Sequence, residues 1–328
     1  MSILHTLIPL VLLATLPAAA LAKGVPLKRH SVMADGHPVV VWEKSAPNAS
    51  EAILLVHGRT WSALPDFDLQ VKDEELSLMD GLVAAGYGVF AVDLRGYGET
   101  QRDASGWLTP NRAADDVASV VRWIRETGEW QTLPHLFGWS MGSTVSQLMV
   151  QRHPEQVASL TLFGYWRDCD EEFEPSDPEA VPLRESNTME NATSDFITPG
   201  AISQRAIGAY ATAALKADPM RVDVRGHDQY NVLNAGQLRL PVLVIVGEHD
   251  PIAPASLQAK LYARIASGHK QYVTVPGGDH AAFLETPRAY FLHALVSFLQ
   301  GSTLQGTAMK GRPAAGETAG SPEDHSAR

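Results

Sequence analysis

Short apolar runs, each followed by a stretch with helical spacing, recur along most of this chain and limit the folds open to it. The runs are AILLVHG, GVFAVDLRG, LPHLFGWS, VASLTLFGYW, PVLVIVGEHD and KQYVTVPG. An apolar run that ends at a glycine or a polar residue is typical of a strand buried on both faces of a sheet. Because helices separate these strands, the connections are crossovers and the strands run mostly parallel. The pattern predicts an α/β fold with a doubly wound, mostly parallel sheet, preceded by a hairpin at Asp35-Gly36.

The alternation stops between about Arg167 and Arg239. This segment has no buried-strand pattern, opens with the acidic stretch RDCDEEFEPSDPE and holds one alanine-rich helical stretch, AISQRAIGAYATAALKADP. It is too long for a plain loop and too poor in strands for a second sheet. We therefore expect a helical cap at 167–239, inserted into a domain of residues 23–300 whose core is 23–166 and 240–300.

Both ends of the chain differ from this body. Residues 3–22 are apolar, small residues crowd their end, and Ala20-Leu21-Ala22 fits an A-x-A cleavage signal. This predicts a signal peptide at 1–22 that is cleaved near Ala22, and hence a secreted or periplasmic protein without stable membrane insertion; a retained anchor helix is the alternative. Residues 301–328 are rich in Gly, Ala, Ser and Pro without an apolar period, which predicts a disordered tail.

Composition argues against several classes of function. A net charge of −11 without a basic patch argues against nucleic-acid binding. Cys169 is the single cysteine, which rules out an internal disulfide and a cysteine-based metal cluster. The histidines show no paired ligand spacing, so we expect no metal site.

Residues with the chemistry of a hydrolytic triad follow three of the predicted strands. Ser140 follows LPHLFGW within a G-x-S-x-G spacing, Asp250 follows VLVIVGEH, and His280 follows VTVPGGD. Open parallel sheets bind ligands beyond the carboxyl ends of their strands. A triad needs a nucleophile, a base that takes its proton and an acid that orients the base. We therefore expect Ser140, His280 and Asp250 to meet at one edge of the sheet.

With these residues in place, the chain resembles the α/β-hydrolase family from about Glu51 to Leu299. The resemblance rests on LLVHG, DLRGYGET, GWSMG, GEHDPIAP and GGDH, and on the chain order serine, aspartate, histidine. It implies that Ser140 is the nucleophile, His280 the general base and acid, and Asp250 the orienting acid. Glu248 and Asp168 are rival acids, and Asp250 could instead serve only as a helix cap.

The resemblance also implies an oxyanion hole made of backbone N–H groups. Met141 would supply one donor, at the N-terminus of the helix after the serine. Arg59 would supply the second, with Thr60 as the alternative. We expect His57 to brace this loop. Small or apolar residues are common at the position of Arg59 in the family, and its side chain could neutralise a substrate carboxylate or pair with an acid.

Other side chains near the expected site have open assignments. Four aromatic residues predict a pocket for aryl or apolar acyl groups, although each could belong to the core: Trp61, Trp139, Tyr165 and Trp166. The remaining histidines are interpreted as surface or packing residues: His135, His153, His227, His269 and His293. The acidic run Asp168 to Glu179 is either a solvated lid loop or an anionic rim that holds a substrate amine, as cap glutamates do in the related proline iminopeptidases.

These features lead to one expected function and several alternatives. We expect a serine hydrolase that cleaves small-molecule carboxylic esters through an acyl-enzyme and needs no cofactor. The preference for esters over amides comes from the family resemblance. The alternatives are a proline-iminopeptidase-like aminopeptidase, a carbon–carbon bond hydrolase or perhydrolase, and a non-catalytic binding protein on the same fold. A dehalogenase is disfavoured because those relatives carry aspartate where Ser140 stands.

Overall fold

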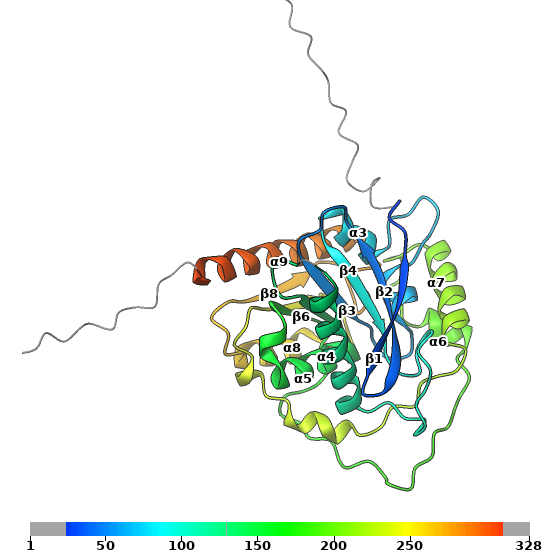
Figure 1. Ribbon diagram of the computed structural model, residues 1–328. Helices are drawn as coiled ribbons and strands as arrows, with labels where there is room; N and C mark the ends of the chain where they lie inside the picture. Colours follow the sequence, from blue (N-terminus) through cyan, green and yellow to red (C-terminus); the bar gives the residue numbers. More distant parts are fainter. Residues whose placement is uncertain (1–23, 129, 311–328) are drawn as a thin grey trace, which may run out of the picture.

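The computed structural model describes residues 24–128 and 130–310 (Figure 1). The expected signal peptide and residues 311–328 of the expected tail lie outside these residues. The described chain forms an eight-stranded sheet in the order β1-β2-β4-β3-β5-β6-β7-β8. The strands are β1 (Lys28–Ala34), β2 (His37–Ser45), β3 (Ala52–Val56), β4 (Gly88–Asp93), β5 (His135–Trp139), β6 (Ser159–Phe163), β7 (Val242–Gly247) and β8 (Lys270–Val275).

The pairing of the strands confirms the predicted mostly parallel sheet. The β1–β2 and β2–β4 pairs are antiparallel, and every later pair from β3 to β8 is parallel. The first hairpin turns at Asp35-Gly36, where both residues have positive φ, 47° and 72°. That geometry suits the twist of a tight two-residue hairpin.

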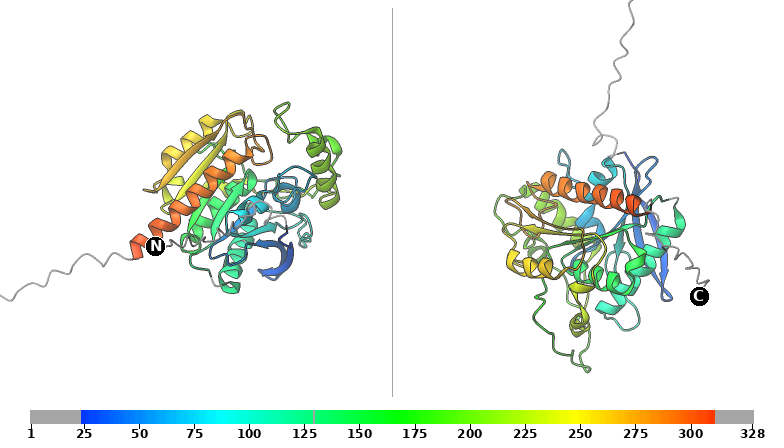
Figure 2. Two further views of the ribbon diagram at one scale, coloured as in Figure 1. Left: turned by 90° about the horizontal axis from the view of Figure 1, so that it is seen from above. Right: turned by 90° about the vertical axis from the view of Figure 1, so that its left-hand side faces the viewer.

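Helices cover both faces of the sheet (Figures 1 and 2). The helices of the core are α2 (Ala63–Phe67), α3 (Leu78–Ala84), α4 (Pro110–Thr127), α5 (Met141–Arg152), α8 (Ala255–Arg264) and α9 (Arg288–Lys310), with the short 3-10 turn η1 (Pro154–Gln156). Buried side chains of α4, α5 and α8 join one hydrophobic cluster, and those of α3 and α9 join another. In β3, Leu54 packs into the first cluster and Leu55 into the second. Successive side chains of a strand point to opposite faces, which explains why this strand is apolar throughout.

Between β6 and β7 the chain leaves the sheet and forms helices and long loops. These 78 residues, 164–241, contain α6 (Met189–Thr193), α7 (Gln204–Ala217), η2 (His227–Val232) and η3 (Ala235–Gln237). All of them lie in the described part of the chain, and none belongs to a strand. We call residues 167–239 the cap. Helix α7 packs against α2 of the core, so the cap lies close to the loop that follows β3.

Helix α9 runs through Lys310, so the expectation of a disordered tail from residue 301 was wrong for its first part. Gly301 does not end the helix. Ser302 is buried and its hydroxyl donates to the Phe298 carbonyl, while Thr303 donates to Glu51. The burial of Ser302 and the contact of Thr303 with Glu51 therefore favour a continued helix, although the local composition is typical of a disordered tail. Within the described residues, no helix combines the length and the apolar character that crossing a membrane requires.

Candidate active site

Ser140 occupies a sharp turn between β5 and α5. Its backbone has φ 53° and ψ −118°, a conformation that non-glycine residues rarely adopt. A Cβ at Gly138 would overlap the carbonyl of Gly142, and one at Gly142 would overlap the carbonyl of Val56. The two glycines of the G-x-S-x-G spacing thus allow the tight approach that holds the serine in strained backbone.

His280 and Asp250 are joined by a short hydrogen bond. The Nδ1 atom of His280 lies 2.8 Å from Oδ2 of Asp250, and both residues are buried. A carboxylate oxygen accepts, so Nδ1 carries the proton and Nε2 is left as the basic nitrogen. The other oxygen of Asp250 accepts from the Ile252 and Ala253 amides, both at 2.9 Å. Asp250 therefore caps its own loop and contacts the histidine as well.

The rival acids are engaged elsewhere. Glu248 accepts from the Gly277 amide at 2.8 Å, and its side chain is half exposed. Asp168 pairs with Lys260 at 2.7 Å. Among the hydrogen bonds of the described residues, His280 Nδ1 is paired with Asp250 alone.

His57 braces the loop that follows β3. The Leu94 amide donates to its Nε2 at 3.1 Å, so Nδ1 carries the proton and donates to the Gly58 carbonyl at 2.8 Å. Burial lowers the pKa of His57 to about 4, which keeps the ring neutral at pH 7. Thr60 directs its N–H toward the Tyr97 hydroxyl at 3.5 Å. This leaves Arg59 as the better candidate for the second oxyanion donor.

A cavity of about 650 Å³ connects these groups. Ser140 and His280 line it together with Gly58, Arg59, Thr60 and Met141. Of the four aromatic residues that the sequence predicted near the site, Trp139 and Trp166 line the cavity, whereas Trp61 and Tyr165 do not. We call this space the catalytic cavity.

Two of the four predicted pocket aromatics were therefore misplaced. Trp61 is buried behind Asp195, to which its indole N–H donates at 2.7 Å. Tyr165 is fully buried and packs into the cluster beneath α4 and α5, while its neighbour Trp166 faces the cavity. Tyr165 and Trp166 are neighbours in the segment that follows β6, yet Trp166 lines the cavity and Tyr165 does not, so sequence proximity to the site does not decide which residue reaches it.

The cap supplies wall residues that the sequence did not reveal. They are Phe173, Glu174, Ser176, Asp195 and His227, and Ile252 joins them from the loop after β7. His227 was interpreted as a surface or packing residue, and that was incomplete because it lines the cavity beside Trp166. Burial and the charge of Arg59 lower the pKa of His227. The acidic run could have drawn attention to Glu174, but no motif marks Asp195 or His227.

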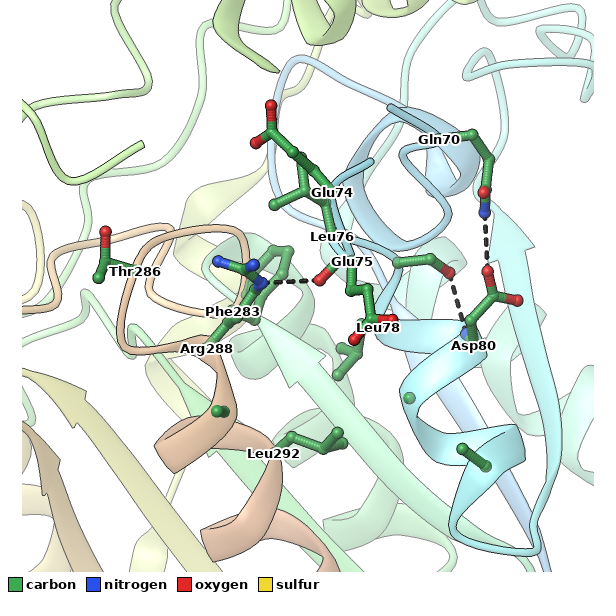
Figure 3. A pocket seen from close by; sticks show the side chains of 14 residues that line it. Gln70, Glu74, Glu75, Leu76, Leu78, Asp80, Phe283, Thr286, Arg288 and Leu292 are labelled. Carbon is green, nitrogen blue, oxygen red and sulfur yellow. Dashed lines mark hydrogen bonds between the residues drawn. The ribbon is translucent and has the colours of Figure 1, made fainter. Parts of the chain in front are cut away.

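A second cavity, of about 310 Å³, lies between α3 and α9 and is separate from the triad (Figure 3). Arg288 spans it by donating to the Glu75 carbonyl at 2.7 Å, and Gln70 donates to Asp80 at 2.9 Å. Ser140, Asp250 and His280 are absent from its described lining. Of the two cavities, the catalytic cavity is therefore the one that Ser140 and His280 line.

Glu285 lies buried beneath the loop that carries His280. Its Oε2 accepts from the Asp279 amide at 2.9 Å. Burial, reinforced by the neighbouring Asp279 carboxylate, raises the pKa of Glu285 from 4.5 to about 9. The pKa of Asp279 is lowered, because its hydrogen bonds, led by that with Glu285, outweigh the effect of burial. Glu285 is therefore protonated at neutral pH.

This raised pKa predicts a pH-dependent stability. The folded chain keeps a proton that the unfolded chain releases, so the stabilisation is fully present below pH 4.5 and is lost as the pH rises through about 9. We expect Glu285→Gln, which has a similar size but does not titrate, to remove a slope of about 1.4 kcal/mol per pH unit in that window. Denaturant unfolding of both proteins from pH 6 to 9 measures the difference, with exposed Glu126→Gln as the control. Identical slopes for wild type and Glu285→Gln would contradict the assignment.

Comparison with known proteins identifies the family. Residues 53–294 match the model of the "Alpha/beta hydrolase family". A pimeloyl-[acyl-carrier protein] methyl ester esterase of Neisseria meningitidis serogroup A is 27% identical over 293 residues, which cover 80% of this chain and 83% of that protein. The lysophosphatidylserine lipase ABHD12 of Danio rerio is 25% identical, over 70% of this chain and 52% of its own length.

Solved structures agree in fold. A serine hydrolase, CCSP0084, from Cycloclasticus zankles superposes with a TM-score of 0.64 at 18% identity, covering 84% of this chain and 99% of that one. A thermophilic esterase from Thermogutta terrifontis gives a TM-score of 0.58 at 22% identity, covering 84% and 99%. At these identities the structures show the fold alone. Together with the family match and the esterase relatives, they show that the chain is a hydrolase that belongs to the alpha/beta hydrolase family.

Proposed function

We propose that this protein is a serine hydrolase that cleaves small carboxylic esters through an acyl-enzyme. One observation carries the proposal: Oδ2 of Asp250 lies 2.8 Å from Nδ1 of His280 and so keeps the proton on that nitrogen, while His280 and the strained Ser140 line the same cavity. This arrangement leaves a basic nitrogen and a hydroxyl facing a shared space, which is what acyl transfer to serine needs.

The reaction follows from these positions. His280 Nε2 takes the hydroxyl proton of Ser140 while Oγ attacks the ester carbonyl carbon. The amides of Met141 and Arg59 hold the oxyanion that forms. The carbon–oxygen bond to the alcohol then breaks, and His280 returns its proton to the leaving alcohol. Water next attacks the acyl-enzyme with His280 again as the base, which releases the acid and restores Ser140.

The substrate class is supported by the walls of the catalytic cavity and by the relatives. Trp139, Trp166 and Phe173 offer apolar surface to an aryl or alkyl acyl group. Several relatives are named as methyl ester esterases, which supports a small alcohol as the leaving group. We therefore propose esters of apolar acids with small alcohols as the preferred class.

A second candidate is hydrolysis of substrates that carry a free amine. The acids Glu174 and Asp195 line the catalytic cavity with Ser140, and carboxylates facing an aromatic wall suit an ammonium group. Arg59 in the same lining opposes this preference. The non-catalytic alternative would place the same groups in a binding site without turnover.

One panel of substrates separates these candidates. Neutral acyl methyl esters and aryl esters are compared with matched α-amino acid esters and amides, using kcat/KM. The ester proposal expects hydrolysis of the neutral esters, with Glu174→Gln changing kcat/KM by less than about threefold. A requirement for the amine, with a loss of tenfold or more in Glu174→Gln, would instead assign the aminopeptidase function.

We also propose that the protein is exported. Residues 3–22 are apolar and end in the A-x-A pattern at Ala20-Leu21-Ala22, which supports a cleaved signal. N-terminal sequencing of the protein from the periplasm or the medium should then begin at Lys23. A chain that still begins at Met1 in the membrane fraction would instead assign a retained anchor.

A further inference from the structure

The loop of residues 58–63 joins β3 to α2 and carries Arg59, the proposed oxyanion donor. Thr60 in this loop has a φ of 94°, a left-handed conformation that is unfavourable for a β-branched residue. A strained loop keeps such a conformation only when its surroundings hold it there. The contacts that hold it therefore decide where the Arg59 N–H points.

Three acids accept hydrogen bonds from this loop. The pairs are Ala63 N to Asp93 Oδ1 at 3.0 Å, Ser62 N to Asp218 Oδ2 at 2.8 Å, and the Trp61 indole N–H to Asp195 Oδ2 at 2.7 Å. Asp93 ends strand β4, but Asp195 and Asp218 belong to the cap. Part of the support for the 58–63 loop thus comes from the cap rather than from the core.

Asp218 uses both carboxylate oxygens on backbone of the core. Besides Ser62, it accepts from the Gly98 amide at 2.7 Å, in the loop that follows β4. Its own carbonyl accepts from the Asn187 side chain at 2.9 Å, and only 3% of the residue is exposed. Burial raises the pKa of Asp218, although the N–H donors stabilise the carboxylate and act in the opposite direction. The result is a fixed bridge from the end of α7 to two core loops.

We propose that Asp218 is a positioning residue of the oxyanion hole, holding the 58–63 loop from the cap so that the Arg59 N–H faces the reacting oxygen. The inference rests on the proposed acyl-transfer function. Asp195 is less informative, because it lines the catalytic cavity and can touch a substrate. Asp218 is absent from the described lining of that cavity, so its influence on the reaction passes through the loop.

The test replaces Asp218 with asparagine. Asparagine offers one acceptor oxygen, and its NH₂ group cannot accept, so one of the two core amides loses its partner. We expect kcat on a neutral ester to fall about 10- to 100-fold with KM within about threefold, because a displaced donor weakens oxyanion stabilisation selectively. Affinity for a trifluoromethyl ketone, which forms a tetrahedral oxyanion on serine, should fall by the same factor as kcat/KM. Affinity for the carboxylic acid product should change little.

A matched control removes another bond between cap and core. Asp223, also in the cap, pairs with Arg102 of the core at 2.9 Å, and its contacts do not include the 58–63 loop. Asp223→Asn should lower the melting temperature without changing kcat or ketone affinity. Asn187→Ala is a milder second variant, since it loosens the Asp218 backbone but keeps the carboxylate. It should lower kcat about two- to fivefold with KM unchanged, a fraction of the effect of losing a donor.

The outcomes separate the inference from the proposed function. If wild type neither hydrolyses esters nor reacts at Ser140 with a fluorophosphonate, the proposed function itself fails. If wild type does both but Asp218→Asn keeps its kcat and ketone affinity, Asp218 has no positioning role. Equal losses in Asp218→Asn and Asp223→Asn would assign the effect to general cap stability and overturn the inference. Should Asp218→Asn not fold, an unchanged kcat in Asn187→Ala overturns it as well.

Discussion

Replacing Ser140 with alanine is expected to lower kcat for ester hydrolysis by about 10⁴- to 10⁶-fold. The reason is the loss of the attacking oxygen, because a water molecule in its place is not held in the position that the turn between β5 and α5 gives the serine hydroxyl. The fold should tolerate the change, since alanine keeps the Cβ and removes only a hydroxyl from a backbone that already has φ 53°. Stopped assays with an aryl ester measure the rate, and circular dichroism and melting temperature check the fold.

Labelling with a fluorophosphonate probe provides the independent readout. Wild type should react stoichiometrically and the alanine variant should not react. Ser146 offers a matched control, because it lies on the same helix α5, is fully buried and has a hydroxyl without a partner in the described structure. Ser146→Ala should keep activity and labelling. Equal labelling of wild type and Ser140→Ala would show that another residue is the nucleophile.

Replacing Asp250 with asparagine should cost about 10⁴-fold in kcat, with little change in shape. The asparagine NH₂ group could face His280, where the carboxylate oxygen now accepts. Alternatively the asparagine oxygen could turn toward His280, which would leave the Ile252 and Ala253 amides without the acceptor that they now have in Asp250. In the first case the proton of His280 is no longer held on Nδ1, so Nε2 is a poorer base toward Ser140; in the second case the loop loses its two amide contacts, and a neutral oxygen stabilises the imidazolium less than a carboxylate does. The measurement is kcat across pH 6–10, alongside the melting temperature.

The rival acids serve as controls for this prediction. Glu248→Gln and Asp168→Asn should retain near wild-type kcat, because their side chains bind Gly277 and Lys260 rather than His280. Near full activity in Asp250→Asn would mean that a different group orients His280. In that case the controls become the next candidates, with Asp168 tested first.

The centre of the sheet was predictable because its inner strands, β3 to β7, are buried on both faces. The alternation of Leu54 and Leu55 between two cores forces continuous apolar runs, and such runs separated by helices admit few topologies. The five-residue helix α2 carries no such signal, since a single turn has no periodicity to detect. The extension of α9 was missed because the burial of Ser302 and the tertiary hydrogen bond from Thr303 to Glu51 outweigh a composition typical of tails.

The candidate site divides along the same line. Ser140, Asp250 and His280 could be proposed from the sequence because each follows a strand whose end is fixed by the topology. The walls could not be found in this way. Asp195 and His227 come from cap loops whose path depends on packing rather than on a repeating pattern. Nothing in the sequence shows that Trp139 lines the cavity while Trp61 is turned to Asp195 instead. Wall residues can therefore be assigned only from the three-dimensional structure, whereas the candidate triad follows from chain order, spacing and the family resemblance.

The direction of α9 has a practical consequence for handling the enzyme. Its far end at Lys310 lies on the opposite side of the molecule from α6 and α7 (Figure 2). A surface tether, affinity tag or fused partner attached beyond this helix would stand away from the cap. Immobilisation through this end should therefore leave α6 and α7 unobstructed.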